Sequence, residues 1–310
     1  MKISQQLQSL NSFAQPLVKP VWRSHDSETL RELEARTVSF SFDASSLLAK
    51  QREMAPVTRS IVLDWMVEVA ANCYFKRETL HLATCYFDKY LSVTEAVPRT
   101  QLQLVGATAL LLAAKFEEVV TPSVEELLKA TAYTYESWEV CAMEKDFVRV
   151  LQWRMLPATL NQWVNYIFVE WDKFAKEVML ESGFLFREPR ESSYKMYRSA
   201  MHIQDVALLD IHHHTCPYSH LALAILRSIL SRFHNAKQQR WSSAFSHFCA
   251  EVLGLMSLET LRTSFAYVDS FTLPEEFGLP KVRSRHFEEF LNLQTYSPET
   301  LRSIRLKYSL

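Results

Sequence analysis

The apolar run from Leu102 to Ala114 constrains the fold of this chain more than any other segment. A helix that is apolar on every side belongs in the middle of a helical bundle or in a membrane. This run is shorter than the roughly 18 residues at which an apolar segment suggests a membrane span. It also contains Gly106 and several alanines, whose small side chains let neighbouring helices approach closely. We therefore expect a central helix surrounded by other helices, with Lys115 at its exposed end.

Glycine is unusually scarce, at 4 of 310 residues. Tight turns, phosphate loops and β-hairpins draw on glycine, so its scarcity favours an all-α chain and argues against Rossmann and P-loop enzymes. The net charge of -1 gives no basic excess that would indicate nucleic-acid binding. The five cysteines are scattered without a C-x-x-C pair, and the segment after Met1 lacks an apolar leader. We expect reduced cysteines in a soluble protein of the cytosol or nucleus.

Apolar residues recur at helical spacing in two sets of five predicted helices. The first set covers residues 57–75, 78–91, 99–118, a short helix after the capping box at Ser123, and 134–152. The second covers residues 160–179, 192–209, 217–233, 240–255 and 258–271. In each set the third helix is the most apolar, so the pattern repeats at the level of architecture. A short helix at 28–36 precedes both sets, and Ser297-Pro298 begins one more helix in the tail.

Residues that could carry enzyme chemistry do not form a catalytic constellation. The run from His212 to His214 lies in a short predicted loop, and adjacent histidines rarely converge on one ion, so we expect solvated side chains there. The pairs Glu117-Glu118 and Glu125-Glu126 are typical of charged helix ends. We expect no metal, no cofactor and no catalytic residue.

Charged residues inside the apolar helices form a pattern that resembles the cyclin box. Residues 58–69, Thr-Arg-Ser-Ile-Val-Leu-Asp-Trp-Met-Val-Glu-Val, resemble the opening helix of that family, Met-Arg-Ala-Ile-Leu-x-Asp-Trp-Leu-x-Glu-Val. Segments 78–92 and 102–118 resemble its second and third helices, and Met143-Glu144 resembles its fifth. The order and spacing fit across residues 57–153. The resemblance implies an all-α protein with two tandem five-helix cyclin folds.

The expected organisation has five parts. They are a poorly ordered N-terminus (1–20), an N-terminal helix and linker (21–55), an N-terminal cyclin box (56–156), a C-terminal cyclin fold (157–275) and a C-terminal helical tail (276–310).

Residues 150–157, Val-Leu-Gln-Trp-Arg-Met-Leu-Pro, resemble the Leu-Lys-Trp-Arg-Leu-x-Pro of E-type cyclins. Val21-Trp22 and Leu208-Leu209-Asp210-Ile211 are also similar to E-type sequences, whereas 80–83 and 102–106 fit A-type cyclins equally well. The resemblance thus implies control of the G1/S transition, with an A-type or B-type cyclin of S, G2 or M phase as the alternative. A tandem cyclin-fold transcription adaptor would need a basic face. An all-α terpenoid synthase would need an acidic metal motif, which the sequence lacks.

The resemblance implies a regulatory subunit that activates a cyclin-dependent Ser/Thr kinase and has no catalytic residues of its own. Carried over by position, Lys115 and Glu144 would bind the kinase, with apolar contacts from Phe116, Val148 and Trp153. The implied docking groove for Arg-x-Leu substrates and inhibitors comprises Ile61, Val62, Trp65, Glu68, Leu102 and Gln103. Thr58 departs from the usual methionine beside that groove. Arg59 and Asp88 would form a structural ion pair between the first two helices.

The implied location is nuclear and also cytoplasmic, with neither nucleic acid nor membrane as a partner. Thr121-Pro122 and Ser297-Pro298 fit the minimal Ser/Thr-Pro acceptor of a proline-directed kinase. Both precede predicted helices, and we interpret both as helix starts.

Overall fold

The computed structural model describes residues 23–181, 190–233, 238–253 and 258–272, and these contain helices and no β-strand. The prediction of an all-α protein is confirmed. The expected N-terminus (1–20), the tail (276–310) and its Ser297-Pro298 helix lie outside the described residues. The elements are α2 (Arg23–Phe40), α3 (Ala44–Lys50), α4 (Pro56–Asn72), α5 (Arg77–Val93), η1 (Arg99–Gln101), α6 (Leu102–Glu117), α7 (Val124–Ala130), α8 (Ser137–Val150), α9 (Leu160–Glu181), α10 (Arg190–Leu209), η2 (Ile211–Thr215), α11 (Tyr218–Phe233), α12 (Gln238–Leu253), η4 (Leu258–Leu261) and α13 (Arg262–Thr272).

Helix α6 is the centre of the first half of the molecule. Every residue from Leu104 to Ala114 is buried, and α4, α5, α7 and α8 pack around it. Gly106 explains the close approach of α4, because a Cβ there would lie 3.1 Å from the sulfur of Met66. The apolar run therefore forms the caged helix that the sequence predicts.

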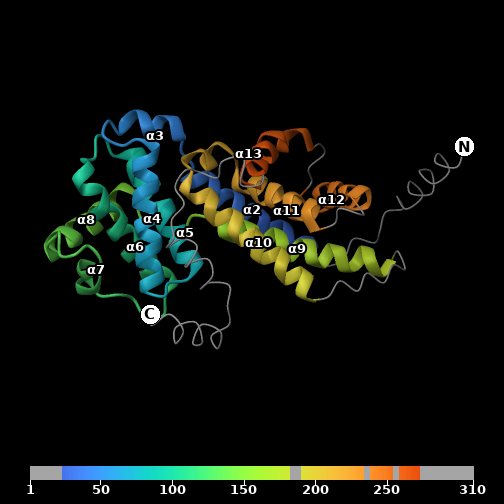
Figure 1. The fold of residues 1–310 in the computed structure, drawn as a ribbon, viewed down its shortest axis with the longest axis horizontal. Helices are drawn as coiled ribbons and strands as arrows, with labels where there is room; N and C mark the ends of the chain where they lie inside the picture. Colours follow the sequence, from blue (N-terminus) through green and yellow to red (C-terminus); the bar gives the residue numbers. More distant parts are fainter. Residues whose placement is uncertain (1–22, 182–189, 234–237, 254–257, 273–310) are drawn as a thin grey trace, which may run out of the picture.

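Helix α11 has the same place in the second half. Its residues from Leu221 to Leu226 are buried, and it packs against α9, α10, α12 and α13. In Figure 1 the helices α3–α8 gather in one half of the molecule, and α2 lies with α9–α13 in the other. The third helix of each predicted set is therefore buried among the other helices of its half, as the sequence predicts.

Helix α2 is longer than the predicted helix at 28–36, and it packs on the second half. Leu33 and Phe40 are buried, and Leu30 packs partly against the same core, whereas Val38 is exposed. Arg36 donates hydrogen bonds to the carbonyl oxygens of Leu156 (2.9 Å) and Pro157 (3.2 Å) in the connection before α9. The short α3 was not predicted. It begins at the N-cap Asp43, and Leu47 anchors it in the core.

Helix α5 joins the two halves through polar side chains in its first two turns. The Arg77 Nε and the His81 Nε2 lie 2.8 Å from the two carboxylate oxygens of Asp205 on α10. The Glu78 carboxylate accepts hydrogen bonds from Thr159 (2.7 Å) and Asn161 (2.7 Å) at the start of α9. These contacts hold the surface of the first half in a defined position relative to the second.

Helix α7 begins with the capping box that the sequence predicts. The Ser123 hydroxyl accepts from the Glu126 amide, and the Glu126 carboxylate accepts from the Ser123 amide. Thr121-Pro122 therefore lies in the loop before the cap, so its interpretation as the helix start is wrong. Among the described helices, none has both the length and the apolar character that crossing a membrane requires.

Candidate functional site

Lys115 and Glu144 meet at the surface where α6 ends beside α8. The Lys115 ammonium donates to the Glu144 carboxylate, and the two side chains remain 42% and 24% exposed. Lys115 lies in the last turn of α6, directly after the buried stretch that ends at Ala114, where the helix dipole favours a cation. The result is an exposed charged pair on top of an apolar bundle.

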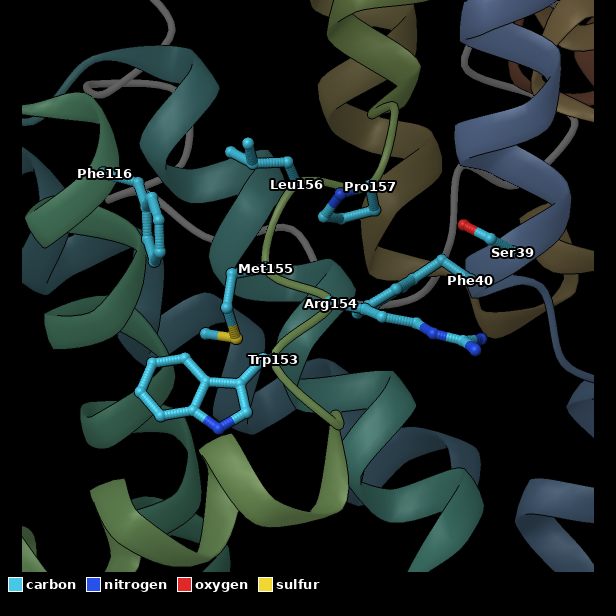
Figure 2. Close-up of a pocket in the computed structure, with 8 residues that line it drawn as sticks. All are labelled: Ser39, Phe40, Phe116, Trp153, Arg154, Met155, Leu156 and Pro157. Carbon is cyan, nitrogen blue, oxygen red and sulfur yellow. The ribbon is translucent and has the colours of Figure 1, made fainter.

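An apolar hollow of about 450 Å³ lies next to this pair. Phe116, 49% exposed, and Trp153, 80% exposed, line one side of it. Figure 2 shows these two rings on one side and Ser39, Phe40 and Arg154 on the other, with Met155, Leu156 and Pro157 between them. Val148 is half-buried and packs against the main core. Large exposed aromatic rings around a hollow beside a charged pair form a surface suited to a protein partner.

The backbone turns Trp153 outward at the end of α8. Gln152 and Trp153 both have left-handed conformations, with φ of 52° and 61°. The Trp153 amide donates to the Val148 carbonyl (3.2 Å), which ends the helix in a tight turn. A left-handed conformation costs a residue other than glycine roughly 1–2 kcal/mol. The fold therefore bears strain at the residue that exposes the largest aromatic ring of this surface.

The six predicted groove residues lie along α4 and the start of α6. Ile61 is 55% exposed, and Val62, Trp65, Glu68 and Gln103 are half-buried. Leu102 is 1% exposed and forms part of the core beneath the others. Five of the six residues thus reach the surface, and Thr58 lies half-buried at the N-terminal end of the same helix.

Arg59 and Asp88 form a fully buried ion pair between α4 and α5. The Arg59 Nε and Nη2 each lie 2.7 Å from one carboxylate oxygen of Asp88. The Arg59 Nη1 donates to the carbonyl oxygens of Leu208 (3.0 Å) and Leu209 (3.2 Å) at the end of α10. Burial would raise the pKa of the Asp88 carboxyl, but the Arg59 guanidinium outweighs it and holds this pKa well below its usual range. The pair therefore also fastens the second half of the chain to the first.

The histidine run lies beside this ion pair, and we call Arg59, Asp88, His213 and His214 together the buried clamp. The prediction of a solvated loop is therefore wrong for two of the three histidines. His214 Nε2 lies 2.9 Å from the Asp88 carboxylate, and His213 is fully buried, whereas the side chain of His212 is 60% exposed. The His213 Nδ1 lies 2.6 Å from the Asp210 carbonyl, an acceptor, so this nitrogen carries the proton. Ligand atoms of Asp88, His213 and His214 lie within 4.8 Å of one another. However, the Arg59 guanidinium already neutralises the carboxylate and would repel a metal cation.

Several residues of these sites could not be found from the sequence. Ser39 and Phe40 come from α2, far from the α8 end in sequence, and no local pattern connects them to Trp153. His214 lies 126 residues from Asp88, and only the fold brings them together.

A family model and two similar proteins that match this chain are all cyclins. The family described as "Cyclin, N-terminal domain" matches residues 28–156. The G1/S-specific cyclin-E of Drosophila melanogaster is 30% identical over 196 residues, which are 60% of this chain and 28% of that protein. Cyclin-A2 of Gallus gallus is 40% identical over 129 residues, which are 42% of this chain and 32% of that protein. The chain thus spans about a third or less of the length of these two relatives.

Two solved structures share the fold. A viral cyclin from herpesvirus saimiri superposes with a TM-score of 0.58 at 18% identity, covering 77% of this chain and 96% of that one. A chain of the CAK complex of Chaetomium thermophilum bound to ATP-gamma-S gives 0.55 at 15% identity, covering 91% and 96%. At these identities the likeness concerns the fold alone.

Proposed function

We propose, from the match of residues 28–156 to the N-terminal cyclin domain, that this chain is the regulatory, activating subunit of a cyclin-dependent Ser/Thr protein kinase. The observation that carries this proposal is the exposed Lys115–Glu144 pair next to the hollow lined by Phe116 and Trp153. Charged hydrogen-bonding groups beside aromatic anchors are typical of binding hot spots. In this proposal the kinase supplies every catalytic group, and this chain supplies the surface that organises them.

The mechanism follows from the needs of a kinase active site. A protein kinase is active only when a glutamate of its αC helix pairs with a lysine of its β3 strand, which then positions the ATP phosphates. Lys115 would donate to, and Glu144 accept from, main-chain groups beside αC. Phe116, Val148 and Trp153 would pack on the apolar side of that helix. Binding only the inward position of αC shifts the kinase population towards the active state.

The finer assignment is to the G1/S transition, with nuclear and cytoplasmic residence. It is supported by the Trp153-containing segment that resembles E-type cyclins and by the 196-residue match to a G1/S-specific cyclin-E. The alternative, an A-type cyclin, is supported by the higher identity over a shorter stretch to cyclin-A2.

Substrate docking would use the surface of α4. The exposed Ile61 and the half-buried Val62 and Trp65 offer apolar contact for the leucine of an Arg-x-Leu peptide. Glu68, one to two turns further along the helix, supplies the charge that attracts the arginine.

The experiment that tests the function is capture of a kinase by the purified chain from an extract of cycling cells, with phosphorylation of a histone-type substrate assayed on the beads. We expect the wild-type chain to recover a Ser/Thr kinase and the double variant Lys115→Ala/Glu144→Ala to recover at least tenfold less. The matched control is Glu259→Ala/Arg262→Ala, which removes an exposed ion pair on the second half and should leave recovery unchanged. Equal recovery with the Lys115/Glu144 variant would overturn the proposed interface, and recovery of no kinase by the wild-type chain would overturn the function.

A further inference from the structure

The loop between α6 and α7, residues 118–123, exposes an unusual combination of side chains. Val119 is 95% exposed and Val120 is 83% exposed, and the Thr121 that follows is also exposed. The backbone is extended at both ends of the loop, with φ and ψ of −98° and 144° at Glu118 and −73° and 160° at Ser123. The chain bends at Val119 and Val120 between these ends, so Thr121 lies on an exposed loop that a modifying enzyme can reach.

The fold anchors the two ends of this loop and makes no use of Thr121. At one end the Glu118 carboxylate accepts hydrogen bonds from the Lys76 amide (2.6 Å) and from the Thr79 hydroxyl at the start of α5. At the other end Ser123 and Glu126 form the capping box of α7. The Thr121 side chain is not the cap of that helix. Its hydroxyl can therefore be modified without removing a hydrogen bond on which α7 depends.

Thr121 is followed by Pro122, which is the minimal acceptor of a proline-directed Ser/Thr kinase. We propose that Thr121 is phosphorylated by such a kinase, and that the phosphate prevents this chain from binding its own partner kinase. In the reaction the Thr121 hydroxyl oxygen attacks the γ-phosphorus of ATP, and the new O–P bond forms as the bond to ADP breaks. The hydroxyl proton passes to the catalytic aspartate of the modifying kinase.

The phosphate would oppose kinase binding because Thr121 lies close to the proposed kinase-binding surface. Thr121 lies five positions after Phe116, so their Cα atoms lie at most about 18 Å apart. One side of a standard protein interface covers about 800 Å², which corresponds to a radius of roughly 16 Å around its centre. An interface of this size centred on Lys115 and Phe116 would therefore extend to the loop with Val119 and Val120 or close to it.

A phosphate on that loop opposes binding for two physical reasons. It adds a charge of about −1.5 to −2, which must lose water if the neighbouring valines are to be covered. It also lies three residues from the Glu118 carboxylate, and the ammonium nearest that carboxylate, Lys76, is already engaged with Glu118 (4.0 Å) and with the Glu117 carbonyl. This regulatory effect rests on the proposed kinase-binding function, whereas the modification of Thr121 does not.

The modification is tested with the purified full chain, ATP and a proline-directed kinase already assembled with a different cyclin. The only other Ser/Thr-Pro pair in the sequence is Ser297-Pro298, so the Ser297→Ala variant isolates Thr121. We expect mass spectrometry to place one phosphate on Thr121 in this variant. Adding either Thr121→Ala or Pro122→Ala should abolish it, although the second change keeps the hydroxyl. Absence of phosphate from Thr121, or equal labelling with Pro122→Ala, would overturn the site.

The regulatory effect is tested by comparing the phosphorylated and unphosphorylated Ser297→Ala chains for affinity towards a purified kinase that E-type cyclins activate. We expect phosphorylation to weaken binding at least tenfold, and the unphosphorylated Thr121→Ala chain to bind as the wild type does. Equal affinity of the two forms would overturn the regulatory effect alone. Failure of the unphosphorylated chain to bind would overturn the proposed function together with this effect, and a phosphate mapped to Thr121 would still establish the modification.

Discussion

Two ion pairs in the first half of the molecule differ in their surroundings, because one is buried and the other is exposed to water. Arg59 and Asp88 are 0% exposed and share two hydrogen bonds of 2.7 Å, with further contacts to His214 and to α10. Lys115 and Glu144 keep much of their surface in water. An exposed pair contributes only about 0–1 kcal/mol to stability, whereas loss of one partner of a buried pair costs several. The comparison separates residues that hold the fold from residues that remain available to a partner.

The largest expected effect is on the buried pair. Asp88→Ala would leave the Arg59 guanidinium buried without its counter-charge, so we expect the free energy of unfolding at pH 7 to fall by about 3–5 kcal/mol. Urea denaturation monitored by circular dichroism measures this. Glu259→Ala, which breaks an exposed pair with Arg262, is the control and should change stability by less than about 0.5 kcal/mol. A loss below 1 kcal/mol for Asp88→Ala would show that the pair does not hold the two helices together.

At Trp153, on the exposed surface, a mutation should raise the stability of the fold and weaken the binding of the kinase. Trp153→Gly removes a side chain that is 80% exposed and relieves its left-handed backbone, so the free energy of unfolding should rise by up to about 1 kcal/mol. The same change removes an aromatic anchor, and kinase affinity should fall about 30-fold, or about 2 kcal/mol. Trp153→Ala keeps the strain, so it should weaken binding similarly without the gain in stability. If both variants bind the kinase as the wild type does, Trp153 is not part of the interface.

The sequence predicts the packed helices well and the environment of single polar residues poorly. The apolar run of α6 and the capping box at Ser123 are local patterns, so both could be located before the fold was known. The histidine run is polar in sequence, yet His213 is buried and the His214 side chain is only 8% exposed. The turn η2 brings His214 to Asp88, a contact that no local pattern contains. Phe40 reaches the hollow beside Trp153 for the same reason. A short helix such as α3 has too few residues for periodicity to distinguish it from a loop.

The buried clamp should also make stability depend on pH. Burial, together with His214 and Arg59, holds the pKa of His213 well below its usual range, and burial lowers that of His214 although Asp88 partly opposes it. Each ring therefore takes up its proton at a lower pH in the folded protein than in the unfolded chain, where histidine titrates near pH 6.5. Their contribution is therefore complete above pH 6.5 and is lost as the pH falls. Stability should drop from pH 7 to pH 5 by up to about 1.4 kcal/mol per pH unit for each histidine.

Urea denaturation at a series of pH values separates these two histidines from the rest of the protein. The variant His213→Gln/His214→Gln should show a flatter dependence between pH 7 and pH 5, because glutamine does not titrate. The exposed neighbour His212 is the matched control, and His212→Gln should keep the wild-type slope. The lowered pKa of Asp88 affects stability only below about pH 4, outside this window. An unchanged slope in the double variant would contradict the buried, neutral state of the two rings.

The smallest expected effect is on peptide affinity and comes from Thr58, the residue before Arg59. Thr58 precedes Arg59 on α4 and is half-buried beside the candidate docking groove, whereas Arg59 faces the core. Thr58→Met adds apolar surface without touching the ion pair. Covering some 20–40 Å² more of apolar area should strengthen binding by about 0.5–1 kcal/mol, or two- to fivefold. Fluorescence anisotropy with a labelled Arg-x-Leu peptide measures the gain, and Glu68→Ala should remove most of the affinity in both backgrounds. If Thr58→Met leaves peptide affinity unchanged while Glu68→Ala abolishes it, the peptide binds nearer the middle of α4 than the N-terminal end of the helix.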